Sequence, residues 1–217
     1  MTLSGPRREA ASGKGNALIV LVHGYGADGN DLIGLADPLA PHLPDAIFVA
    51  PNAPQKCTGN PMGYQWFPIP WLDGSTEQAA ADGMRQAVVA LNAYLDDLEK
   101  SEGIAPDRTI LVGFSQGTMM SLHVAPRRER SFAGVVGFSG RLLDPELLDK
   151  ETVSKPPIVL IHGDQDDVVP TSSMPLAASQ LGNAGFDVTT HLSQGTGHGI
   201  APDGLQVAYQ FIAKHLG

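Results

Sequence analysis

Ser115 lies at the centre of the segment GFSQG (113–117), where its residue type and the flanking glycines suit nucleophilic catalysis. An apolar run precedes this segment and a helical pattern follows it. In such a strand, turn and helix context a G-x-S-x-G serine becomes a nucleophile, because the strained turn projects its hydroxyl above a sheet. An incidental serine in a tight turn is the alternative interpretation. Ser139, in GFSG (137–140), lacks the second glycine and is interpreted as a strand end.

A serine hydroxyl is a weak nucleophile and requires a base that a third group orients. Of the seven histidines, His198 is the best candidate, because it lies in GTGHG (195–199) between the last predicted strand and the last predicted helix. Glycines on both sides would let its ring swing over the sheet edge. His23 and His162 end predicted strands, where packing or a structural hydrogen bond is the expected role.

The third group should be an acid that stands between the serine and the histidine in chain order. HGDQDDVVP (162–170) follows a buried run and fills this place. Asp164, Asp166 and Asp167 are the candidates, and because Asp readily stabilises turns, two of them are expected to be structural or solvated. A metal site of His162, Asp164 and Asp166 is the alternative, but no further ligands accompany these residues.

Attack on a carbonyl group also requires two backbone N–H donors for the oxyanion. One is expected from Gln116, directly after the nucleophile, and the other from Tyr25 in HGYG (23–26). Glycines 24, 26 and 29 also match G-x-G-x-x-G, which would indicate a dinucleotide phosphate site. That site would need an acidic residue at the end of the second strand. The sequence there is APN (50–52), so the oxyanion interpretation is favoured.

The elements that must position these residues follow a regular alternation. Short apolar runs bounded by turn residues predict strands at 18–22, 47–50, 109–113, 133–138, 158–161 and 188–192. Helical patterns cover 76–101, the stretch from Ser115 to before Pro126, 173–184 and the chain from about Pro202. The strands are nearly apolar throughout, which favours a mostly parallel sheet with helices on both faces. The alternation predicts a single α/β domain over residues 1–217.

Turn and cap residues mark the ends of these elements. Ser75 and Gln78 resemble a capping box before the 76–101 helix, and Gly103 should end it. Two loops interrupt the alternation, at 24–36 and at 51–74, and the second is long and rich in proline. Long loops without secondary structure in compact domains are usually functional. Its apolar residues are expected to contact substrate, with core packing as the alternative for each of them: Met62, Tyr64, Trp66, Phe67 and Trp71.

Composition excludes several classes of protein. The 217-residue chain has a net charge of −9, which disfavours nucleic acid, polyanions and anionic membrane surfaces as partners. The longest aliphatic run, 17–22, is too short for an integral membrane segment, and the first sixteen residues lack an apolar signal core. Cys57 is the single cysteine, so a disulfide within the chain and a thiolate metal site are excluded. A soluble, cytoplasmic protein is expected.

The motifs taken together resemble the phospholipase/carboxylesterase family of small α/β-hydrolases, which includes acyl-protein thioesterases and bacterial carboxylesterases. They occur in the order HGYG (23–26), PNAP (51–54), WF (66–67), GFSQG (113–117), HGDQD (162–166) with VVP (168–170), and GHGI (197–200). The resemblance spans 18–216 and implies an eight-stranded α/β-hydrolase core without a large cap domain. It implies Ser115 as nucleophile, His198 as base and Asp166, the second Asp of its motif, as acid. It also places Trp66 and Phe67 beside the acyl pocket.

The activity implied is that of a serine carboxylesterase acting on a small-molecule ester of small to medium acyl chain, without metal or cofactor. An acyl-protein thioesterase or a lysophospholipase is the alternative. A lactonase is disfavoured because the elbow carries Ser rather than Cys, and a non-enzymatic binding protein because the triad is complete. Homodimers are compatible with the resemblance, although no stripe of residues identifies an interface. Three parts of the sequence depart from the usual family residues: Tyr25, Pro68 and TMM (118–120). These departures leave the chemistry intact but affect the expected shape of the substrate pocket.

Overall fold

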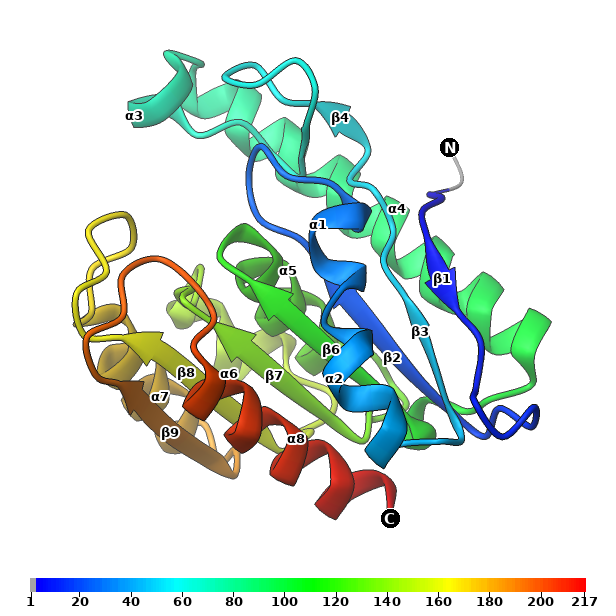
Figure 1. Cartoon of the computed structure of the whole chain (residues 1–217). Coiled ribbons are helices and arrows are strands. Elements are labelled where there is room, and N and C mark those ends of the chain that lie inside the picture. Colours follow the sequence, from blue (N-terminus) through cyan, green and yellow to red (C-terminus); the bar gives the residue numbers. More distant parts are fainter. Residues whose placement is uncertain (1–2) are drawn as a thin grey trace.

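A seven-stranded sheet organises the computed structural model, which describes residues 3–217 (Figure 1). Its strands are β1 (Arg7–Arg8), β2 (Ala17–Val22), β3 (Ala46–Val49), β6 (Thr109–Phe114), β7 (Gly134–Phe138), β8 (Ile158–Gly163) and β9 (Val188–Ser193). Their spatial order is β1-β3-β2-β6-β7-β8-β9. All neighbours pair in parallel except β1, which is antiparallel to β3. The predicted α/β class is confirmed, but the described residues form seven strands in this sheet rather than the eight that the resemblance implies.

Helices cover both faces of the sheet, because the strands are apolar on both sides. They are α1 (Gly29–Ile33), α2 (Ala36–Leu39), α3 (Pro70–Asp73), α4 (Glu77–Glu102), α5 (Gln116–Val124), α6 (Leu148–Glu151), α7 (Ser173–Asn183) and α8 (Pro202–Leu216). One hydrophobic core joins the sheet to α4, α5, α6 and α7, through residues such as Leu91, Met120 and Leu181. The other joins it to α1, α2 and α8, through residues such as Leu32, Ala36 and Ile212. Figure 1 shows α1, α2 and α8 together on one side of the sheet.

The ends of the longest helix follow capping chemistry. Gly103 ends α4 in the left-handed conformation at φ 66°, as predicted from the sequence. At its start, however, the cap is Thr76, whose hydroxyl accepts a hydrogen bond from the Ala79 amide at 3.1 Å. The predicted capping box of Ser75 and Gln78 is therefore wrong by one residue.

The sequence analysis expected a long loop without secondary structure at 51–74, but the structure shows secondary structure there. The segment contains the two-stranded hairpin of β4 (Gln55–Lys56) and β5 (Tyr64–Gln65), followed by the short helix α3. This hairpin also bonds to the loop after β2: Gly26 donates to the Tyr64 carbonyl at 2.8 Å, and Tyr64 donates to the Ala27 carbonyl at 2.8 Å. The two loops that interrupt the strand and helix alternation are thus joined to each other.

Within residues 3–217, no helix is both long enough and apolar enough to cross a membrane.

Candidate active site

Ser115 occupies a strained turn between β6 and α5. Its φ of 54° and ψ of −115° lie where few residues with side chains are found. The flanking glycines make this turn possible, because their backbones touch their neighbours. A Cβ on Gly113 would lie 2.5 Å from the Gly117 carbonyl oxygen, and one on Gly117 would lie 1.8 Å from the Val22 carbonyl oxygen. The collisions that the sequence analysis attributed to side chains at these two positions are confirmed.

The loop after β2 passes directly over Ser115. A Cβ on Gly24 would lie 3.3 Å from the Ser115 Cβ, a tight contact, so glycine lets the chain pass close to the serine without a shift. The next residue is Tyr25. In the described part of the chain, no hydrogen bond uses the backbone N–H of Tyr25 or of Gln116. Two amides close to the serine are therefore free to donate to a ligand.

His23 holds this loop in place from beneath. The Ala53 amide donates to His23 Nε2 at 2.9 Å, which leaves Nδ1 as the protonated nitrogen, 2.7 Å from the Gly24 carbonyl oxygen. The ring is fully buried, and burial lowers the pKa of His23, so it stays neutral. His23 thus fixes the backbone next to Tyr25, which agrees with the structural role predicted for it.

The Tyr25 side chain ties the same loop to α3. Its hydroxyl donates to Asp73 Oδ2 at 3.1 Å and accepts from the Gly59 amide at 3.3 Å. Burial raises the pKa of Tyr25, and its contact with Cys57 adds to the effect, so the phenol remains protonated. The sequence had indicated only the backbone of Tyr25. Asp73 and this bond gave no signal there, because they join positions 48 residues apart.

Gln116 supports the site with its side chain as well as its backbone. Its Oε1 accepts from the Trp66 amide at 2.9 Å, and its Nε2 donates to the Phe67 carbonyl at 2.8 Å. The Trp66 indole is fully buried and donates to the His23 carbonyl at 2.9 Å. The expectation that Trp66 contacts substrate is therefore corrected: its ring belongs to the packing beneath the site, because its polar N–H and its surface are both used there.

The other residues of this segment that are expected to bind substrate range from buried to exposed. Phe67 is buried, whereas Met62 is 83% exposed in the hairpin. Tyr64 is half-buried, with the Lys56 ammonium 3.8 Å from its ring centroid. Trp71 is 72% exposed on α3. Contact of these four residues with substrate stays a prediction.

Asp166 and His198 come together at the ends of β8 and β9. His198 Nδ1 lies 2.8 Å from Asp166 Oδ2. The other carboxylate oxygen, Oδ1, accepts from the amides of Val168 and Val169, each at 2.9 Å. Of the three candidate aspartates, Asp166 is the buried one, whereas Asp167 is exposed and Asp164 accepts from the Thr196 amide at 3.2 Å. Three contacts therefore fix the Asp166 carboxylate and direct it toward His198.

These contacts determine the charge of Asp166. Burial alone would raise its pKa, but hydrogen bonds from His198, Val169 and Val168 outweigh burial, and the pKa of Asp166 lies below its ordinary value. His162, buried in β8, adds a contact from its Nε2 at 3.2 Å to Asp166 Oδ2, while the same nitrogen lies 3.0 Å from the Val169 carbonyl oxygen. His162 thus braces the acid, in line with the structural role predicted for it.

Phe114, which precedes Ser115, connects the serine to the histidine. Its ring centroid lies 5.0 Å from that of His198. No hydrogen bond joins Ser115 Oγ to the His198 ring in the described chain. Hydrogen bonds of this kind are often long in ligand-free enzymes and shorten when substrate binds. Gly163 allows the histidine loop to approach, since a Cβ there would lie 2.3 Å from the Thr196 carbonyl oxygen.

The described residues contain no group of three or more His, Cys, Asp or Glu side chains that could hold a metal ion. His162 and Asp166 instead contact each other, while Asp164 bonds to a backbone amide. These bonds account for the polar atoms that the sequence analysis had considered as metal ligands.

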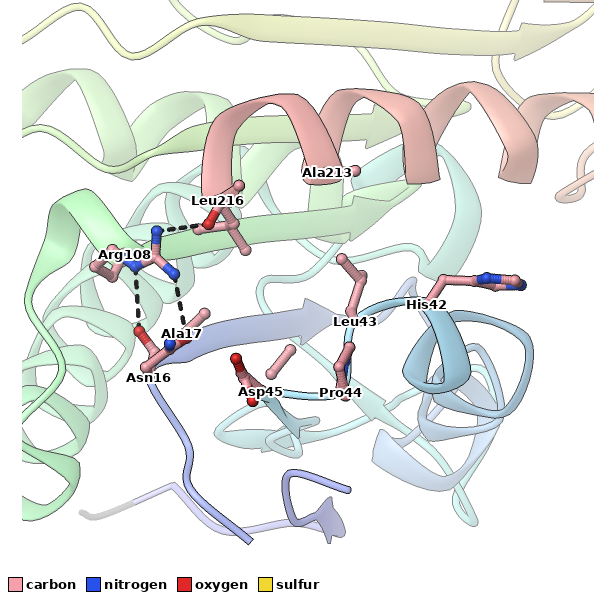
Figure 2. Close-up of a pocket in the computed structure, with 11 residues that line it drawn as sticks. Asn16, Ala17, His42, Leu43, Pro44, Asp45, Arg108, Ala213 and Leu216 are labelled. Carbon is pink, nitrogen blue, oxygen red and sulfur yellow. Dashed lines mark hydrogen bonds between the residues drawn. The ribbon is translucent and has the colours of Figure 1, made fainter. Parts of the chain in front are cut away.

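A cavity of about 210 Å³ lies at the opposite edge of the sheet (Figure 2). It is bordered by the starts of β2 and β3 and by the end of α8. Arg108 crosses it and donates to the Asn16 carbonyl at 3.2 Å, to the Asn16 side chain at 3.1 Å and to the Leu216 carbonyl at 2.6 Å. Since Ser115 lies at the other end of β6, this cavity is separate from the candidate active site.

Comparisons with known proteins agree with this fold and identify the family of the chain. The family model described as Phospholipase/Carboxylesterase matches residues 5–216. Esterase YpfH of Escherichia coli (strain K12) is 31% identical over 196 residues, which cover 90% of this chain and 81% of that protein. Acyl-protein thioesterase 1 of Gibberella zeae is 28% identical over 95% of this chain and 93% of its own. The crystal structure of esterase PE8 superposes with a TM-score of 0.94 and 47% identity over 100% of both chains. The chain belongs to the phospholipase/carboxylesterase family of hydrolases.

Proposed function

We propose that this chain is a serine carboxylesterase that hydrolyses esters of small to medium acyl chain through an acyl-enzyme intermediate. The observation that carries the proposal is the bond of 2.8 Å between His198 Nδ1 and Asp166 Oδ2, beside a serine held in a strained turn. This bond leaves His198 Nε2 as the nitrogen available to accept the Ser115 proton. The names of the similar proteins, esterase YpfH and esterase PE8, support the same reaction class.

In the first half of the reaction, Ser115 Oγ forms a bond to the ester carbonyl carbon while its proton moves to His198 Nε2. The carbonyl electron pair moves onto oxygen, where the free amides of Tyr25 and Gln116 stabilise it; such a donor is worth about 2.7–4 kcal/mol in typical enzymes. Asp166 is ionised because of its lowered pKa, and it stabilises the imidazolium. His198 then donates the proton to the leaving alcohol as the bond to that oxygen breaks.

In the second half, His198 accepts a proton from water, whose oxygen attacks the acyl carbon. The oxyanion again lies between the same two amides, and collapse of the intermediate releases the carboxylic acid and returns the proton to Ser115. The first turn of α5 points its positive dipole end at this centre, which favours the negative charge of both intermediates.

The test is Ser115→Ala, which should reduce hydrolysis of p-nitrophenyl butyrate to the uncatalysed rate while the circular dichroism spectrum stays unchanged. A fluorophosphonate probe should label the wild type at Ser115 and not at Cys57, the buried cysteine. Retained esterase activity in Ser115→Ala, or labelling that survives this substitution, would disprove the assignment.

A thioesterase is the second candidate, because acyl-protein thioesterase 1 of Gibberella zeae aligns over 95% of this chain. The same residues would cleave a thioester, since the leaving sulfur needs even less protonation than an alkoxide. Phenyl butyrate and S-phenyl thiobutyrate differ only in the leaving atom, so the ratio of their kcat/KM values separates the two. A series of acyl lengths on the p-nitrophenyl ester measures the depth of the acyl site.

A further inference from the structure

Arg141 differs from every other arginine in the described chain. Its guanidinium donates no hydrogen bond and has no carboxylate within ion-pair distance there. The remaining arginines all have polar partners: Arg7, Arg8, Arg85, Arg127, Arg128 and Arg130 pair with carboxylates, and Arg108 donates to the oxygens of Asn16 and Leu216. In a chain with 23 acidic residues and a net charge of −9, an arginine without any hydrogen-bond or ion-pair partner is unexpected.

The backbone that carries Arg141 lies next to the candidate active site in space. It follows Ser139 and Gly140, which leave the carboxyl end of β7 directly beside the serine turn. The Ser115 amide donates to the Phe138 carbonyl at 2.9 Å, and a Cβ on Gly140 would lie 3.0 Å from the Ser115 carbonyl oxygen. The chain that carries Arg141 is therefore in backbone contact with the nucleophile.

On its other side, the Arg141 guanidinium lies over the Trp71 ring of α3, with the guanidinium carbon 5.1 Å from the ring centroid. This contact connects the segment after β7 to the 51–74 segment, whose Trp66 and Phe67 are held by Gln116. Arg141 therefore bridges two segments that both contact the serine turn.

The bonding capacity of Arg141 remains unused. Stacking on an aromatic ring occupies the face of a guanidinium and leaves its N–H groups, which point outward in the plane, free to donate. The Arg141 Nε atom is buried and has no hydrogen-bond partner. A buried donor without an acceptor costs free energy, so an arginine held in this way is prepared for an acceptor that the described chain does not supply. A planar oxyanion group suits it best, because a guanidinium binds carboxylate or phosphate through two parallel bonds.

A cavity of about 380 Å³ adjoins Arg141 and gives such a group room. It is lined by Arg141, Leu142, Leu143, Asp144, Ser173, Leu176, Ala177 and Gln180. Leucine and alanine side chains suit the carbon chain of a ligand, and Arg141 is the one cation among these lining residues. Asp144 is the one carboxylate, and it forms no ion pair with Arg141 in the described chain. Asp144 should therefore weaken the attraction for an anion without cancelling it.

We propose that Arg141 binds an anionic group of the ester substrate, a carboxylate or a phosphate, at a short distance from the carbonyl that Ser115 attacks. This inference rests on the proposed esterase function and specifies its substrate class: esters that carry a negative charge in addition to the cleaved bond. The anion can belong to the acyl part, as in the monoester of a dicarboxylic acid, or to the alcohol part, as in an acylated glycerol phosphate.

Two matched pairs of substrates test the proposal. Monomethyl adipate and dimethyl adipate differ by one charge on the acyl side, and butyryl glycerol phosphate and monobutyrin differ by a phosphate on the alcohol side. The quantity to measure is the kcat/KM of the anionic ester divided by that of its neutral partner. Arg141→Gln should lower this ratio about tenfold for the pair whose anion reaches Arg141, since hydrogen bonds to charged groups are among the strong ones. Arg141→Lys should lower it less.

Controls separate this role from packing and from net charge. Arg130→Gln removes the same charge at the other end of β7, where Arg130 pairs with Glu99, and should leave the ratio unchanged. Asp144→Asn removes the opposing carboxylate and should raise the ratio. The preference of the wild type for the anionic ester should also shrink with added salt, because ions screen an exposed contact.

Each outcome decides a separate question. If Arg141→Gln lowers kcat/KM equally for charged and neutral esters in both pairs, Arg141 only packs on Trp71 and the inference is wrong. The proposed esterase function would survive that result, because the wild type would still cleave the neutral esters. If the wild type cleaves none of the four compounds, the proposed function itself fails.

Discussion

The two ends of the parallel strands, called here the amino edge and the carboxyl edge of the sheet, differ in how their polar groups are hydrogen-bonded. At the edge where the strands begin, Arg108 donates to three acceptors, two on Asn16 and one on Leu216 (Figure 2). At the edge where the strands end, the amides of Tyr25 and Gln116 and the guanidinium of Arg141 have no acceptor within the described residues. At the amino edge the hydrogen bonds of Arg108 hold the carboxyl-terminal helix in place, whereas at the carboxyl edge these donors are free to bind a ligand.

Backbone conformation separates the two edges in the same way. In the described chain, three residues other than glycine have positive φ: Ser115 at 54°, Ser139 at 46° and Asp144 at 47°. All three lie at the carboxyl edge, at or after the ends of β6 and β7. Strained residues persist only where the surrounding structure holds them, and they gather at functional sites. The comparison therefore predicts that substitutions at the carboxyl edge affect activity more than stability, and substitutions at the amino edge the reverse.

Asp166→Asn should give the largest effect and the clearest test of the carboxyl edge. An amide in place of the carboxylate turns the His198 ring toward the wrong tautomer, and in serine hydrolases such a change costs about 10⁴-fold in kcat. We expect a loss of this order in ester hydrolysis. Asp167→Asn is the matched control, since Asp167 is exposed, and it should retain activity. A larger loss in Asp167→Asn than in Asp166→Asn would transfer the acid role to Asp167.

The same variant reports on the lowered pKa of Asp166 through stability. A carboxyl group whose pKa is lower in the folded state stabilises the fold at pH values above its unfolded pKa, about 3.9, and loses this contribution as the pH falls through the folded pKa. The stability of the wild type relative to Asp166→Asn should therefore decline on acidification below that value. Urea unfolding of both proteins across this pH range measures the difference. A difference that does not depend on pH would contradict the assignment of the shift to Asp166.

Arg108→Ala, at the amino edge, should lower the stability of the fold and leave the activity unchanged. Removing the half-buried guanidinium deprives the oxygens of Asn16 and Leu216 of their donors, and we expect a loss of about 1–2 kcal/mol in unfolding free energy. The kcat/KM for p-nitrophenyl butyrate should stay at the wild-type value. Arg130→Ala is the comparison, because its exposed pair with Glu99 should contribute little. A loss of activity in Arg108→Ala without a loss of stability would break the distinction between the edges.

The strands could be predicted well from the sequence because buried parallel strands consist of continuous apolar runs. Each of the six predicted strands agrees with β2, β3, β6, β7, β8 or β9 to within two residues at either end. The strand β1 was not predicted, because it consists of Arg7 and Arg8, whose pairing with β3 depends on backbone hydrogen bonds rather than on apolar side chains. The hairpin of β4 and β5 was missed for the same reason, whereas α3 was missed because a helix of four residues is too short to show a periodic pattern.

The positions of single side chains were harder to predict than the elements. Ser115 and His198 stood out because glycines flank them, whereas Asp166 was one of three candidate aspartates until the resemblance to the family selected it. The structure brings Asp166 and His198 into contact. Trp66 was misjudged because an aromatic residue in a proline-rich loop looks exposed, whereas a glutamine 50 residues away fixes its backbone in the interior. Arg141 carries no signal in the sequence, since its distinction is the absence of a partner among residues that only the fold brings near.

Ser139→Gly should give the smallest effect, and it tests whether the carboxyl edge stores strain. Ser139 is 1% exposed, its hydroxyl has no hydrogen-bond partner, and its φ is 46°. Glycine adopts positive φ without cost, so the variant should be more stable by about 1 kcal/mol. Ser139→Ala removes the unpaired hydroxyl but keeps the strain, and should gain less. Equal stability of the two variants in urea unfolding would show that Ser139 is relaxed, and the strain of this edge would then be confined to Ser115, where the reaction itself requires it, and to Asp144.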